Sequence, residues 1–67
     1  MSMDSRTIIR LIEQEGWKLV RAKGSHHHFE HGDRSGITTV PHPRNDVNIR
    51  TLRSIEKQSG VKLRDMK

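Results

Sequence analysis

Apolar residues recur at helical spacing near the start of the chain, which predicts an amphipathic helix within residues 3–17. Ser5 or Asp4 can cap this helix by accepting hydrogen bonds from exposed backbone N–H groups. Gly16 stands where a left-handed residue commonly ends a helix. The apolar stripe consists of Ile8, Leu11 and Ile12.

A second stripe of the same period predicts a helix over residues 48–61. Asn48 is a favourable cap, and Gly60 is a favourable stop. Val61 and Leu63 follow the stop and are expected to fold back onto the core. The stripe consists of Ile49, Leu52, Ile55 and Ser59.

Between the helices, three short segments rich in β-branched and alternating residues predict strands. Lys23-Gly24 is expected to turn the chain between the first two strands, and the polar residues 32–36 between the second and third. Pro41 and Pro43 are expected to end the third strand, because proline cannot donate to a strand ladder. The predicted strands are residues 17–22, 25–31 and 37–40.

The predicted order α-β-β-β-α indicates an α+β fold, in which two helices cover one face of a three-stranded antiparallel sheet. The same order occurs in double-stranded-RNA-binding-type domains. The length of 67 residues fits one domain over residues 1–67, with a structured core of about 5–61. Because the chain has no cysteine, disulfides and cysteine zinc sites are excluded.

The formal net charge of +5 favours a polyanionic partner, most often nucleic acid. The cations are dispersed along the chain, which is typical of a charged surface on a folded domain. No apolar run approaches the roughly 20 residues needed to cross a bilayer, and no signal-peptide pattern follows the first methionine. We therefore expect a cytoplasmic protein without a membrane partner.

Four of the five histidines lie in residues 24–31, "GSHHHFEH". Side chains alternate across a strand, so His26, His28 and Glu30 share one face and Ser25, His27, Phe29 and His31 the other. If Phe29 faces the core, His26 and His28 lie on the face without helices. A β-bulge after Gly24 would reverse this assignment.

An exposed imidazole on a basic sheet can transfer protons near neutral pH. RNA supplies its own nucleophile, the 2′-hydroxyl, so one histidine and a few cations suffice to cut it without a metal. Lys23 and Arg44 are the best candidates for phosphate contacts. His42, held between two prolines, is either a second site residue or an ordinary loop histidine.

Two other interpretations of these residues stay open at this point. His26 and His28, with His42 as a third ligand, have a spacing that can chelate a transition metal, although no HExxH pattern supports it. Single surface histidines often have no function. Trp17 is expected in the core and not as a platform for base stacking.

Three stretches, "EQEGWKLVRAKGSHHHFEH", "TTVPHPRNDV" and "TLRSIEKQSGV", together resemble the HicA toxin family, from about Ser5 to Val61. The family consists of small mRNA interferases of bacterial and archaeal toxin–antitoxin pairs. The specific pieces are Gly16-Trp17, Lys23 to His26, the Val40-Pro41 region with its histidine, and Leu52 to Gly60. One departure is Arg50, where the family often has glycine.

The resemblance implies a double-stranded-RNA-binding-type fold, cleavage of mRNA without a metal or cofactor, and neutralisation by a HicB antitoxin. It implies that His26, which follows Gly-Ser directly, is the catalytic residue. His27 is the runner-up if the strand register slips. The auxiliary or RNA-binding candidates are Lys23, Gly24, Ser25, His27, His28, His42 and Arg44.

Two alternatives come from other functional classes. A non-catalytic double-stranded-RNA-binding module would share the fold order and the basic surface, but it normally uses a lysine-rich second helix. Here that helix mixes both signs of charge. The other alternative is a pure interaction partner whose basic face docks an acidic subunit. Loss of growth arrest on removal of one histidine would separate these from the toxin.

Overall fold

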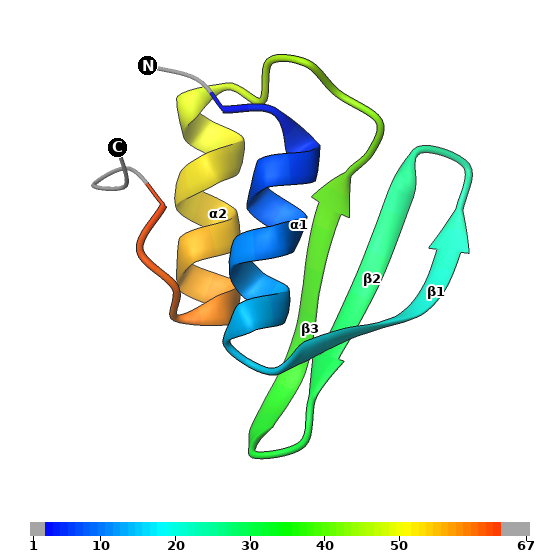
Figure 1. Ribbon diagram of the computed structural model, residues 1–67, viewed down its shortest axis with the longest axis vertical. Helices are drawn as coiled ribbons and strands as arrows, with labels where there is room; N and C mark the ends of the chain where they lie inside the picture. Colours follow the sequence, from blue (N-terminus) through cyan, green and yellow to red (C-terminus); the bar gives the residue numbers. More distant parts are fainter. Residues whose placement is uncertain (1–2, 64–67) are drawn as a thin grey trace.

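The computed structural model describes residues 3–63, which form two helices and three strands (Figure 1). The order α-β-β-β-α and the α+β class agree with the sequence prediction. The outermost parts of the predicted domain, residues 1–2 and 64–67, lie outside the described residues. The elements are α1 Ser5–Gln14, β1 Trp17–Lys23, β2 His26–His31, β3 Arg34–Pro41 and α2 Ile49–Ser59.

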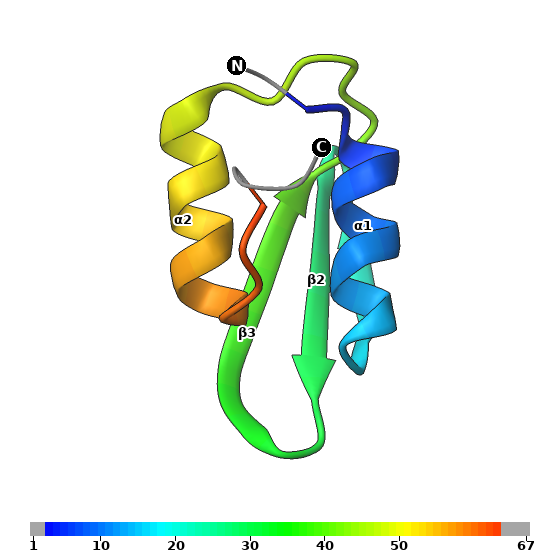
Figure 2. The ribbon, with the colours of Figure 1, turned by 60° about the vertical axis from the view of Figure 1, so that its left-hand side comes forward.

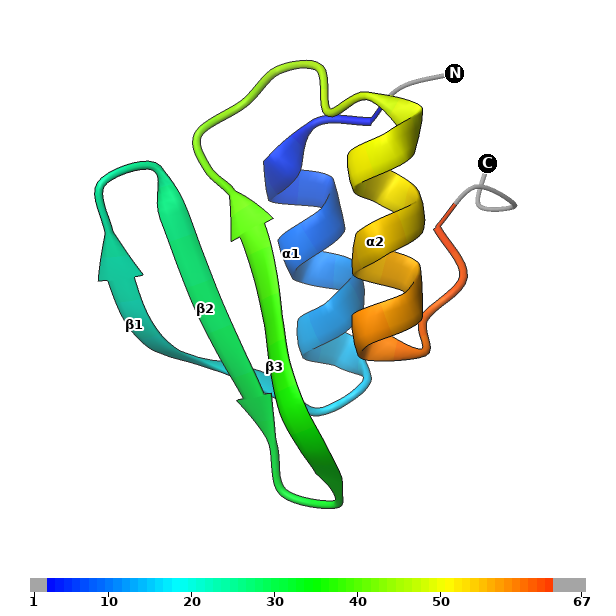
Figure 3. The same cartoon turned by 180° about the vertical axis from the view of Figure 1, so that it is seen from behind.

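The strands form one antiparallel sheet in the order β1-β2-β3, and both helices cover the same face (Figure 2). Seen from the other side, β3 is the strand beside the helices, and the far end of β1 lies away from them (Figure 3). Neither helix of the described residues lies on the opposite face, which we call the open face. The buried core consists of Ile8, Ile12, Trp17, Phe29, Val40, Val47, Leu52, Ile55 and Leu63.

The start of α1 is tied to the loop that precedes α2. Asp4 is the N-cap residue, but its side chain makes no hydrogen bond to the helix backbone. The prediction that Asp4 could cap the helix with its side chain is therefore wrong. Ser5, the other predicted cap, is the first helical residue, and its hydroxyl bonds to the loop instead of the helix. Backbone bonds from Ser5 N to Arg44 O and from Val47 N to Met3 O join the two segments.

The junction of α1 and β1 explains the Gly16-Trp17 pair. Gly16 has a φ of 103°, which favours glycine, and a Cβ there would lie 2.6 Å from Nε2 of His31. That Nε2–H donates to the carbonyl of Glu15 at 2.7 Å, and Nδ1 accepts from the Asp33 N–H at 2.9 Å. Trp17 is buried against the His31 ring, with centroids 5.4 Å apart, so His31 is a structural residue.

The predicted strand bounds were wrong at both turns. The first turn is Gly24-Ser25, not Lys23-Gly24, so β2 begins at His26. The second turn is only Gly32-Asp33, and the residues predicted as a longer loop belong to β3. Pro41 is the last residue of β3 instead of a residue beyond it, which is possible because β3 is an edge strand.

The ends of α2 follow the prediction, but one apolar position does not. The Asn48 side chain accepts from Thr51 N at 3.0 Å, and Gly60 caps the other end with a φ of 75°. Ile49 was expected in the core but is exposed, since Val47 fills the core beside this end of the helix. Leu63 folds back and is buried, as expected. Within residues 3–63, neither helix is long and apolar enough to cross a membrane.

Candidate functional site

The Gly24-Ser25 turn presents His26 at one end of the sheet. Gly24 adopts a φ of 58°, a left-handed conformation that glycine takes without steric cost, and this lets two residues reverse the chain. His26 is the first residue of β2 and is exposed. In the ladder it stands opposite Lys23 on β1 and Pro41 on β3. The register therefore places one cationic side chain beside this imidazole.

The histidines of β2 alternate between the two faces, as the position of Phe29 predicted. Phe29 is buried under the helices, and His27 also lies on the helix side. His26 and His28 therefore share the open face with Glu30. No register shift occurs after Gly24; the shifts lie between Leu19 and Arg21 and between Phe29 and His31.

His28 is held in place by its neighbour across the sheet. Its Nδ1 lies 2.9 Å from Oγ1 of Thr39, and the side chain is half-buried. The backbone N–H of Thr39 in turn donates to Oε1 of Gln58 on α2, at 2.9 Å. The contact fixes the orientation of the second imidazole on the open face, whereas His26 has no such fixed partner among the described contacts.

On the helix side, His27 meets His42. Their ring centroids are 4.8 Å apart, and the ring planes are inclined at 85°. The Nδ1 atom of His27 is buried and has no hydrogen-bond partner among residues 3–63. His42 leaves the end of β3, and its backbone N–H donates to the carbonyl of Ser25 at 2.8 Å. His42 thus supports the turn that carries His26, although its ring lies on the other side of the sheet.

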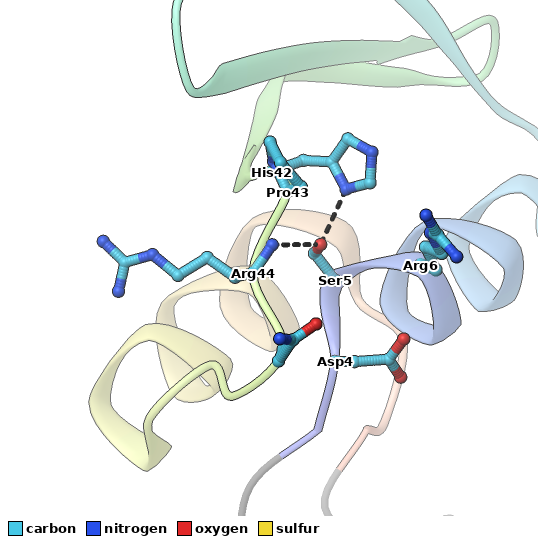
Figure 4. A pocket seen from close by; sticks show the side chains of 7 residues that line it. Asp4, Ser5, Arg6, His42, Pro43 and Arg44 are labelled. Atoms are coloured by element: carbon cyan, nitrogen blue, oxygen red, sulfur yellow. Dashed lines mark hydrogen bonds between the residues drawn. The ribbon is translucent and has the colours of Figure 1, made fainter.

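Ser5 also contacts His42, although the sequence predicted for Ser5 only a role as a helix cap. Its side chain is buried, and its hydroxyl lies between the His42 ring and the backbone of Arg44 (Figure 4). The oxygen accepts from the Arg44 N–H at 2.9 Å and lies 2.6 Å from His42 Nδ1. Because an unpaired buried O–H is unfavourable, the hydroxyl donates to Nδ1, which leaves the His42 proton on Nε2.

A small pocket of about 120 Å³ opens beside this contact (Figure 4). The Arg44 side chain extends away from Ser5 and is exposed, so it is available to an anion from solvent. The carboxylate of Asp4 also lines the pocket and partly offsets the positive charge. The lining residues are Asp4, Ser5, Arg6, His42, Pro43, Arg44 and Asn45.

The predicted site residues thus fall into two groups on opposite sides of the sheet. Lys23, His26 and His28 belong to the open face, while His27 and His42 meet on the helix side. The three histidines weighed as metal ligands are accordingly not brought together. Among residues 3–63, no cluster of three or more histidine or acidic side chains is placed to hold a metal ion.

The sequence was also compared with models of known protein families and with curated proteins. A family model described as the HicA toxin of bacterial toxin–antitoxin systems matches residues 5–61, which is most of the chain. No curated protein matches the chain. The matched segment begins at Ser5 and contains the Gly-Ser turn, the histidine strand and α2. The chain therefore belongs to the HicA toxin family, the toxins of HicA/HicB toxin–antitoxin systems.

Proposed function

We propose that this toxin is a metal-independent endoribonuclease that cleaves mRNA, and that His26 is its proton-transfer residue. The observation that carries the proposal is the exposed position of His26 directly after the Gly24-Ser25 turn of a HicA-family chain. Imidazole gains and loses a proton near neutral pH, which suits it to both steps of RNA cleavage.

The reaction needs no group beyond the RNA and the side chains. The 2′-oxygen of the ribose attacks the adjacent phosphorus while its proton is removed. The bond from phosphorus to the 5′-oxygen breaks, and that oxygen takes a proton. The products are a 2′,3′-cyclic phosphate and a 5′-hydroxyl. His26 removes the first proton or supplies the second, and water exchanges the other proton.

Charge on the open face supports this chemistry. Lys23 stands opposite His26 in the ladder, and Arg21 stands opposite His28. Both cations are exposed, so they can bind phosphate and offset the charge that builds up on the pentacoordinate phosphorus. His28, oriented by Thr39, adds a second imidazole on the same face.

The helix-side group has a supporting role in the proposal. Gly24 and Ser25 shape the turn, and the His42 N–H holds it through the Ser25 carbonyl. His27 packs against His42 and thereby keeps the loop close to the strand. Arg44 is proposed as a phosphate contact at the edge of this group.

A toxin of this kind has a cognate antitoxin. We infer that a HicB-type antitoxin neutralises the chain by covering the open face around His26. The net charge of +5 favours a partner with an acidic docking surface. Such a partner would compete with RNA for the same cations.

The test is expression of the wild type and of His26→Ala, His27→Ala and His28→Ala from a tight promoter, with growth and RNA integrity followed. Each variant is first checked for folding by circular dichroism. We expect growth arrest and RNA loss with the wild type and neither with His26→Ala. Equal arrest by all variants, or none by the wild type, would favour a non-catalytic double-stranded-RNA-binding module.

A further inference from the structure

The open face carries a shallow hollow of about 350 Å³ further along β2 from His26. It is lined by Val20, Arg21, His28, Glu30 and Ile37. By strand alternation His28 lies about 7 Å and Glu30 about 13 Å from His26 along the same face. A ribonucleotide next to a phosphate held at His26 therefore reaches this hollow.

Backbone irregularities shape the hollow. The register between β1 and β2 shifts between Leu19 and Arg21, so Val20 is an extra residue without a partner. The register between β2 and β3 shifts between Phe29 and His31, next to Glu30. Bulges of this kind redirect side chains and are common beside functional sites.

Two apolar side chains form the walls of the hollow. Val20 is 51% exposed and Ile37 is 44% exposed, although both lie on a face that is otherwise polar and cationic. Exposed apolar side chains among cations suit a nucleobase, whose flat faces are apolar and whose backbone is anionic. Arg21 adds a guanidinium that can stack on a base or bind the phosphate beside it.

The carboxylate of Glu30 favours binding of a base over binding of a phosphate in the hollow. Its carboxylate is exposed and lines the hollow, opposite Lys18 on β1. A carboxylate repels phosphate but accepts hydrogen bonds from the N–H groups of a base edge. Guanine alone among the four bases offers two adjacent donors, its ring N1–H and its amino group, that one carboxylate can accept together.

We propose that the hollow is a nucleobase subsite for the RNA substrate and that Glu30 selects guanine in it. Val20 and Ile37 contact the base, and Arg21 contacts its face or its phosphate. The inference rests on the proposed ribonuclease activity for its biological meaning, but base binding can be measured without cleavage.

The binding test uses the cleavage-deficient His26→Ala chain with methyl labels, and short single-stranded RNAs that differ in one base. We expect the Val20 and Ile37 methyl resonances to shift with a guanine-containing RNA, which binds roughly ten- to 100-fold more tightly than its uracil counterpart. Glu30→Gln is expected to abolish that difference. Equal binding of all four bases, or methyl shifts with antitoxin but not with RNA, would overturn the proposal.

The cleavage test uses the chain with His26 intact on a randomised RNA pool, followed by sequencing of the cut ends. Guanine is expected to be enriched at one position beside the cut, and Glu30→Gln to remove the enrichment. Glu13→Gln, an exposed acid on α1, is the matched control and is expected to keep it. A wild type that binds guanine but cuts no RNA would refute the ribonuclease and leave the subsite standing, whereas cutting with unchanged preference in Glu30→Gln would refute the subsite alone.

Discussion

The buried hydroxyl of Ser5 connects three segments that are far apart in the sequence. It bonds to the His42 ring and to the Arg44 backbone, and the His42 N–H in turn holds the carbonyl of Ser25. The start of α1 is thereby linked to the turn that presents His26. We propose that this link makes Ser5 a positioning residue for the turn, since its hydroxyl contacts His42 and the Arg44 backbone.

Ser5→Ala is expected to lower the free energy of unfolding by about 1 kcal/mol, because the Arg44 N–H loses its acceptor. In Ser5→Ala, nitrogen-15 spectra are expected to show that the His42 ring no longer holds its proton on Nε2 alone. Cleavage is expected to slow by about tenfold through misplacement of the turn, with little change in RNA affinity.

Thr7→Ala is the matched control, since it removes another hydroxyl at the same helix end. The Thr7 hydroxyl donates to Asp4 Oδ1, whereas the Ser5 hydroxyl bonds to His42. We expect it to leave the His42 spectrum and the cleavage rate unchanged. An unchanged His42 tautomer in Ser5→Ala, or an equal loss of cleavage in both variants, would contradict the positioning role.

The facing of the histidines could be predicted from the sequence, but the role of Ser5 could not. One buried aromatic residue, Phe29, fixes the phase of an alternating strand, so the faces of His26 and His27 follow from it. Ser5 and His42 are 37 residues apart. Their contact depends on the path of the loop after Pro41, for which no local pattern exists.

At the scale of elements, the junction between α1 and β1 is tightly constrained. Gly16 combines a positive φ with a close approach of the His31 ring. The same ring packs on Trp17 and bonds to the end of α1. A side chain at Gly16 would therefore disturb the helix end and the first strand together.

Gly16→Ala is expected to destabilise the protein by about 1–3 kcal/mol, because alanine is strained at this φ and its Cβ would meet His31. Urea unfolding followed by the fluorescence of Trp17, the single tryptophan, measures the change. Gly32→Ala is the control, since a Cβ there meets nothing within 4 Å. Equal stability of the two variants would refute this account of the junction.

The order of the elements followed from periodicity, whereas their bounds did not. The start of β3 was missed because the polar residues Arg34 and Ser35 carry little strand propensity and join a strand only within the folded sheet. Ile49 has the right helical phase for burial, yet Val47 from the preceding loop takes the core position beside it. Both errors arise where tertiary packing outweighs local pattern.

At the scale of the whole molecule, exposed cations are spread over the helices, the loop and the sheet, and three of them lie on the open face. The net charge is +5, and β1 supplies exposed cations to the open face, which neither α1 nor α2 covers. These cations are Lys18, Arg21 and Lys23. A single-stranded RNA lying across this face would displace counterions, so its binding depends on salt.

RNA binding by the His26→Ala chain is expected to weaken by about 20-fold between 50 and 200 mM salt, as three phosphate contacts to a single strand predict. Lys23→Gln is expected to reduce the salt slope by about 0.7. Lys57→Gln on α2 is the control and is expected to keep the slope. Fluorescence anisotropy of a labelled RNA measures all three, and an effect of Lys57 equal to that of Lys23 would place the RNA elsewhere.

The most direct measurement is cleavage of a defined RNA by the purified chain in the presence of EDTA, with the ends of the products identified. The account predicts 2′,3′-cyclic phosphate and 5′-hydroxyl ends. It also predicts a loss of at least about 100-fold in rate in a folded His26→Ala variant. Products with 5′-phosphate ends that require a metal ion, or undiminished cleavage by His26→Ala, would contradict it.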